Sequence, residues 1–154
     1  MNNRKFSIII GLLSAILVIV SILVMFATAF GASDNMGNPS SHGNCFNVAF
    51  GYQGYSAIPL LVVAFVLQCV GAIFALVGSF LPGRIGGIAL GLGGLLAIVG
   101  GVIWFFSPNL FVSVNGNIPE AENVINGVGS ILTGIFGALG GLIGVYGAYR
   151  AFKA

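Results

Sequence analysis

Four long apolar stretches, separated by polar segments, dominate the hydrophobic pattern of this chain. They cover residues 6–30, 59–81, 85–106 and about 124–149. Each is long enough to cross the hydrocarbon core of a bilayer as a helix, which takes roughly 20 residues. The pattern therefore predicts one four-span membrane domain over residues 1–154. Its spans are joined by a first outer loop over 31–58, a short inner turn and a second outer loop over 107–123.

Small residues recur within these spans, most clearly as glycine doublets seven residues apart in the third span. Glycine is a poor helix former in water, but in lipid the backbone must hydrogen-bond to itself, and glycine then lets a neighbouring helix approach closely. A seven-residue period predicts left-handed packing, and so an all-α, four-helix, left-handed bundle. The glycines expected at helix interfaces are Gly86, Gly87, Gly93, Gly94, Gly100, Gly101, Gly134, Gly137, Gly140, Gly141, Gly144 and Gly147.

The first two spans carry single rows of small residues, whereas the third and fourth carry double rows. The single rows are Ser7, Ser14, Ser21 and Thr28, and then Ala57, Ala64, Gly71 and Gly78. One row is enough to bury one helix face, so the doubled rows exceed that need. We therefore expect the doubled rows to mark faces where other membrane chains attach.

Apolar and aromatic residues also occur in the loops. Phe46, Val48, Phe50 and Tyr52 occur at every second position, as in a half-buried strand, and we expect this run to pair with residues 110–114 in a small outer sheet. The aromatic residues Phe46, Phe50, Tyr52 and Tyr55 are candidate contacts for a partner protein. Trp104 ends the third span, where we expect it at the membrane interface, since aromatic rings collect there.

Charge placement predicts the topology. Only 5% of the residues are charged, against about 25% in a soluble domain. The basic residues lie at the two ends of the chain and in the inner turn, whereas Asp34, Glu120 and Glu122 lie in the outer loops. The positive-inside rule then predicts a multi-pass protein with both termini in the cytoplasm. A net charge of +2 gives no reason to expect a nucleic-acid partner.

Chemically reactive groups are scarce. No predicted span contains Asp, Glu, Lys, Arg or His, which argues against a proton relay or an ion-coupled site. Gln68 is the one strongly polar side chain well inside a span; it is expected to form an interhelical hydrogen bond, with contact to a ligand such as a quinone as the alternative. His42 and Cys45 make an incomplete metal site. The sequence therefore predicts no catalytic site, no metal and no cofactor.

The order of spans and loops resembles the claudin-like tetraspan arrangement, with a long first outer loop, a short inner turn and a shorter second outer loop. Claudins carry a Trp-rich motif and a cysteine pair in their first outer loop. Here that loop contains Cys45 alone and no Trp. The resemblance therefore concerns the layout, and no site residue is transferred from it.

Three functions fit these observations. The first is a non-catalytic structural or accessory subunit that joins a membrane assembly, or assembles with itself, through glycine-rich helix faces. The second is an oligomeric channel for a neutral solute, lined by backbone, Gly, Ser and Thr. The third is an adhesion or recognition protein that uses the aromatic half of the first outer loop.

Overall fold

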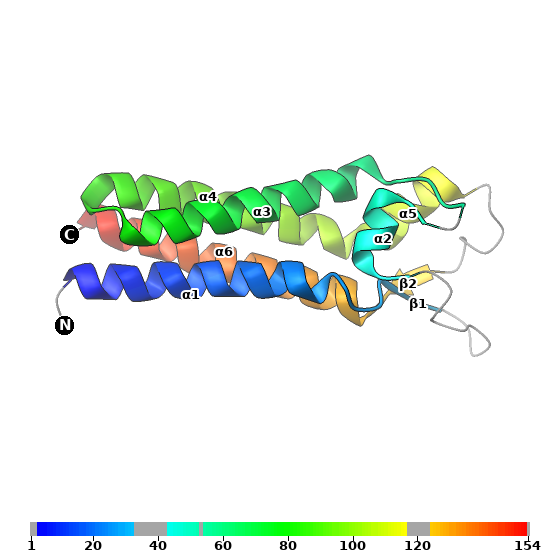
Figure 1. Ribbon diagram of the computed structural model, residues 1–154, viewed down its shortest axis with the longest axis horizontal. Helices are drawn as coiled ribbons and strands as arrows, with labels where there is room; N and C mark the ends of the chain where they lie inside the picture. The colour runs from blue at the N-terminus through cyan, green and yellow to red at the C-terminus, as the bar shows by residue number, and fades with distance from the viewer. Residues whose placement is uncertain (1–2, 33–42, 53, 117–123, 154) are drawn as a thin grey trace.

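Four long helices packed side by side form the body of the protein (Figure 1). The computed structural model describes residues 3–32, 43–52, 54–116 and 124–153. The long helices are α1 (Asn3–Val24), α3 (Pro59–Phe80), α4 (Gly83–Phe105) and α6 (Val128–Lys153), and each is long and apolar enough to cross a membrane. The predicted all-α, four-helix membrane bundle is confirmed, and the chain is a multi-pass integral membrane protein.

The short elements all lie at one end of this bundle, in Figure 1 on the right. They are β1 (Phe30–Ala32), α2 (Cys45–Phe50), α5 (Ser107–Asn115) and β2 (Val124–Asn126). We call these elements, with the described residues between α2 and α3, the outer platform. The opposite end holds the first turn of α1, the α3–α4 turn and the last turn of α6 (Figure 1). We call it the basic end, because Lys5, Arg84, Arg150 and Lys153 lie there.

Each long helix has two neighbours in the bundle. Helix α4 packs between α3 and α6, and α1 lies between the same two helices on the other side, so that α1 and α4 barely touch. The contact between α4 and α6 is the most extensive of the four. This cyclic order joins helices from both ends of the chain. The handedness of their crossing stays a prediction from the seven-residue period.

Two of the predicted spans are too long at the platform end. Helix α1 stops at Val24, and its apolar continuation contains β1. Helix α6 starts only at Val128, because residues 124–126 form β2. The two strands pair antiparallel, with Phe30 opposite Asn126. Hydropathy cannot distinguish a buried strand from the end of an apolar helix, which is why both spans were predicted too long.

The predicted outer sheet of residues 46–52 and 110–114 is wrong, because both runs are mainly helical. Helix α2 buries Cys45, Val48 and Ala49, a helical spacing that the alternating aromatic residues conceal. The side chain of Asn44 accepts a hydrogen bond from the Asn47 N–H at 2.8 Å and so fixes the start of α2. Helix α5 has proline in its first turn, where the missing N–H costs nothing.

The glycine doublets of α4 serve both of its neighbours. A Cβ atom added to the first glycine of each doublet would meet α3, whereas one added to the second would meet α6. At Gly94 that atom would lie 2.5 Å from the Gly141 oxygen and 2.8 Å from the Val145 nitrogen. The glycines facing α3 are Gly86, Gly93 and Gly100, and those facing α6 are Gly87, Gly94 and Gly101.

Helix α6 uses its double row in the same way. Its Gly134 and Gly141 face α4, while Gly140 and Gly147 face α1. Gly137 and Gly144 lie between and approach both sides: added Cβ atoms there would meet groups of α1 and α4. The doubling therefore reflects two neighbours within one chain, and it leaves no surplus glycine face for another chain.

A matched pair of alanine substitutions tests this packing. Gly94→Ala forces backbone atoms of α6 to move, and we expect it to lower the free energy of unfolding by about 1–3 kcal/mol, as overpacking does. At Gly91, one turn away, an added Cβ would meet only the Ala148 methyl at 3.3 Å. Gly91→Ala should therefore cost much less in an SDS unfolding titration. Equal losses for the two variants would contradict the packing described here.

Candidate functional site: a polar node beneath the outer platform

A hydrogen-bonded cluster joins all four long helices in the half of the bundle nearest the platform. Gln68 on α3 is fully buried, and its Nε2 donates to Ser21 Oγ on α1 at 2.8 Å and to the Thr133 carbonyl on α6 at 3.4 Å. The indole Nε1 of Trp104 on α4 donates to Gln68 Oε1 at 3.2 Å. We call Ser21, Gln68, Trp104 and Thr133 the polar node. Each long helix contributes one side chain to it.

The node also ties α1 directly to α6. Ser21 Oγ donates to the Thr133 carbonyl at 2.7 Å, and Thr133 Oγ1 donates to the Ser21 carbonyl at 3.3 Å. Farther toward the basic end, Ser14 Oγ donates to the Gly140 carbonyl at 2.7 Å. The amide of Gln68 uses both its donor and its acceptor on protein groups, an arrangement that fits the interhelical role rather than ligand contact.

Glycines make room for the node. A Cβ on Gly137 would lie 2.5 Å from Gln68 Nε2, and one on Gly100 would lie 2.9 Å from Gln68 Cγ. Trp104 was expected to face the membrane interface, but it is fully buried, and the exposed rings at this end of α4 are Phe105 and Phe106. The reason is the indole N–H, which finds its acceptor inside the bundle. The signal in the sequence that could have indicated this contact is that the spans contain one indole, Trp104, and one strongly polar amide well inside a span, Gln68.

Two asparagines hold the parts of the outer platform to one another and to the bundle. Asn115 at the end of α5 pairs with the backbone of Ser56, accepting from its N–H at 2.8 Å and donating to its carbonyl at 3.3 Å. Asn126 on β2 donates to the Phe105 carbonyl at the end of α4 at 2.9 Å. Beneath them, Phe30 and Phe111 pack edge to face in the largest hydrophobic cluster of the described residues. The platform thus shares one hydrophobic core with the adjoining ends of the long helices, which contribute Leu61, Ala64 and Trp104 to it.

The aromatic residues predicted to contact a partner divide into two groups. Phe50 and Tyr52 are 42% and 38% exposed. Phe46 and Tyr55 are half-buried: the ring of Phe46 lies 4.6 Å from that of Phe50, and the ring of Tyr55 lies 5.2 Å from that of Phe111. Phe50 and Tyr52 are therefore displayed at the surface, and the other two support them.

The cysteines do not form a reactive site. Cys45, the first residue of α2, is fully buried, and this burial raises the pKa of its thiol to about 12. Cys69, on α3, is half-buried, and both thiols are free. In the described ranges, no three His, Cys, Asp or Glu side chains come close enough to hold a metal ion. His42, Asp34, Glu120 and Glu122 lie outside those ranges.

Comparisons with known proteins give no further assignment. No protein-family model matches the chain, and searches of curated proteins and of solved structures find no match. The claudin-like resemblance therefore rests on layout alone, and function has to be argued from the geometry described above.

A double-mutant cycle tests the polar node. Gln68→Leu leaves the Trp104 indole N–H without its acceptor, so it should destabilise the protein by about 1–3 kcal/mol, the usual cost of a buried unsatisfied group. In the Trp104→Phe background the same change should cost less, because no donor is then left unpaired. The SDS unfolding free energies of the four proteins give the coupling. Strict additivity would show that the two side chains do not interact.

Alkylation tests the burial of Cys45. At pH 8 a pKa of about 12 instead of 9.0 lowers the thiolate fraction by about a thousandfold, and the thiolate is the reacting form. Cys45 should therefore resist iodoacetamide until the protein is denatured. A Tyr52→Cys variant supplies an exposed thiol on the same platform, and mass spectrometry of digested peptides should find that thiol modified first. Modification of Cys45 at the same rate would contradict the buried position of α2.

Proposed function

We propose that this protein is a non-catalytic structural membrane protein whose four-helix bundle holds the outer platform for contact with another membrane protein. The observation that carries the proposal is that the small residues and the exposed aromatic residues lie in different parts of the structure. The small residues are used in packing the bundle, and Phe50 and Tyr52 are exposed on a platform whose core is continuous with the ends of the long helices. A rigid, pre-organised surface lowers the entropic cost of association, which favours a recognition role.

The lipid-facing surfaces support this proposal. The exposed side chains of the long helices are bulky and apolar, such as Leu92 and Leu95 on α4 and Leu139 and Leu142 on α6. Such faces suit contact with acyl chains, and the bundle needs no second chain to bury its glycines. Self-assembly through glycine-rich helix faces is therefore no longer the favoured route to an assembly. We favour contact through Phe50 and Tyr52 instead of self-assembly, which combines the accessory-subunit hypothesis with the recognition hypothesis.

The channel hypothesis is disfavoured by the position of the residues that were expected to line the pore. It required Gly, Ser and Thr to line a pore between chains. In the bundle, Ser14, Ser21, Ser130 and Thr133 are buried within one chain. A non-catalytic role is supported by the polar node, whose amide is occupied by protein partners, and by predicted spans without Asp, Glu, Lys, Arg or His. The cytoplasmic position of both termini remains part of the proposal, on the positive-inside rule.

The test is the size of the complex extracted from native membranes in mild detergent. Phe50→Ala combined with Tyr52→Ala should shift the chain from a larger complex toward its own mass, because aromatic anchors contribute most to association. The free energy of unfolding should fall by about 1–2 kcal/mol, because the Phe50 ring also packs on the rings of Phe46 and Phe65, and the variant should remain folded. The matched control is Leu139→Ala with Leu142→Ala, which removes apolar bulk from the lipid face and should leave the complex intact. Migration of the wild-type chain at its own mass, or a complex unaffected by loss of the two rings, would contradict the proposal.

A further inference from the structure

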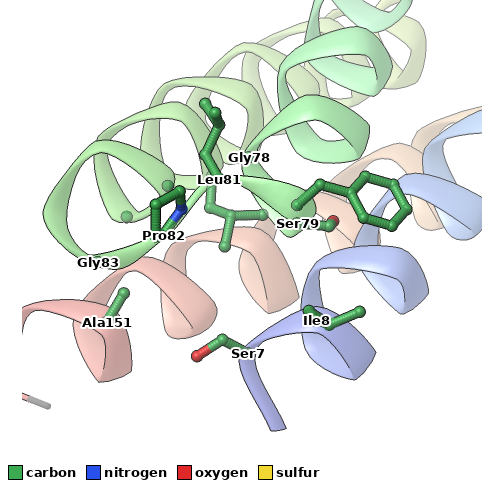
Figure 2. Close-up of a pocket in the computed structure, with 12 residues that line it drawn as sticks. Ser7, Ile8, Gly78, Ser79, Leu81, Pro82, Gly83 and Ala151 are labelled. Atoms are coloured by element: carbon green, nitrogen blue, oxygen red, sulfur yellow. The ribbon is translucent and has the colours of Figure 1, made fainter. Parts of the chain in front are cut away.

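A cleft of about 290 Å³ opens at the basic end of the bundle, far from the outer platform (Figure 2). Ser7 and Ile8 of α1 form one wall, the turn around Leu81 and Pro82 forms another, and Ala151 of α6 lies at a third side (Figure 2). The cleft lies where α1 and α4, which are diagonal in the bundle, barely touch.

The lining is apolar apart from two hydroxyl groups. Ser79 Oγ donates to the Ala75 carbonyl of its own helix at 2.6 Å, so its hydrogen bond is made within α3. No ionisable side chain lines the cleft. A hollow of this composition suits a hydrocarbon chain, since each buried CH₂ is favourable and no polar group of the ligand is required inside.

The surroundings of the cleft carry positive charge. Arg84 directly follows the lining residue Gly83, Arg150 directly precedes Ala151, and Lys5 lies two residues before Ser7. These cations are exposed, and the residues that the structure describes include no Asp or Glu. A cationic rim around an apolar hollow, at the level where helices end and lipid headgroups begin, is complementary to an anionic amphiphile.

Arg150 is held at this rim by an aromatic contact. Its guanidinium carbon lies 5.2 Å from the ring centroid of Phe6, the residue before Ser7. The contact joins the last turn of α6 to the first turns of α1 beside the cleft. The Arg150 guanidinium is therefore held beside the first turns of α1 before any ligand arrives.

We propose that the cleft binds an anionic phospholipid, with one acyl chain inserted between α1 and the α3–α4 turn and the phosphate among Lys5, Arg84 and Arg150. The bundle order supplies the hollow, and the one-sided distribution of basic residues supplies headgroup preference. This site is independent of the proposed contact through the outer platform. A zwitterionic lipid fits the hollow but gains less from the cationic rim, so the site distinguishes lipids by charge.

Native mass spectrometry tests the proposal on the full chain in mild detergent with equal amounts of dioleoyl phosphatidylglycerol and dioleoyl phosphatidylcholine. The wild-type protein should retain phosphatidylglycerol preferentially. Arg84→Gln combined with Arg150→Gln should lower that preference by about fivefold for each cation removed. The matched control, Arg84→Lys with Arg150→Lys, keeps the charge and should keep the preference. Equal retention of both lipids by the wild-type chain would overturn the proposal.

A second set of variants tests the hollow itself. Ser7→Phe should fill the cleft and lower phosphatidylglycerol retention severalfold, and Ala151→Leu serves the same purpose if Ser7→Phe does not fold. Leu139→Phe adds bulk on the lipid face of α6 and should leave retention unchanged. Soluble glycerol phosphate should fail to displace the lipid, because it lacks the chain. Retention unaffected by a folded cleft-filling variant, or displacement by glycerol phosphate, would show that no acyl chain enters the cleft.

Discussion

Close approach of helix backbones is the interaction on which this structure depends. In a bilayer the helices gain little from hydrophobic contact with each other, since lipid is equally apolar, so they associate through packing and interhelical hydrogen bonds. Glycine allows both. At Gly94 and Gly141 the backbones of α4 and α6 meet with no side chain between them. Glycine costs helix stability in water, but the membrane removes the competing water and makes that cost acceptable.

The polar node and the outer platform both follow from this packing. A buried amide such as that of Gln68 needs several partners, and helices held at glycine contact distance bring Ser21, Trp104 and Thr133 within reach. The same four helices end close together, and the described connecting elements α2, α5, β1 and β2 lie over their ends. Asn126 and the β1–β2 pair join α1, α4 and α6 at that level. The close packing of the helices therefore allows the hydrogen bonds of the polar node, and it also positions the outer platform.

The sequence predicted the four helices and the all-α class because uninterrupted apolar length identifies a span with few alternatives. It did not predict that each doublet contacts two helices. A seven-residue period locates a helix face, but it does not give the number of helices that pack against that face. Gly93 and Gly94 face different helices, and only the cyclic order of the bundle explains this.

The outer elements were harder to predict for a related reason. The apolar residues at every second position from Phe46 to Tyr52 imitate a strand. The buried positions of α2 instead follow a helical spacing, which its contacts with the long helices set. For the node, an interhelical hydrogen bond from Gln68 was expected, but Trp104 was assigned to the interface from its position at the end of a span. Burial of that ring depends on long-range packing that one-dimensional patterns do not contain.

The central claim is that the glycine rows pack within one chain. Its most direct test is the unfolding free energy of the wild-type and Gly94→Ala proteins, measured at several protein-to-lipid ratios. Packing inside the chain predicts a difference between the two proteins that stays constant on dilution. A difference that shrinks toward zero as the protein is diluted in lipid would place the contact between chains and contradict the account.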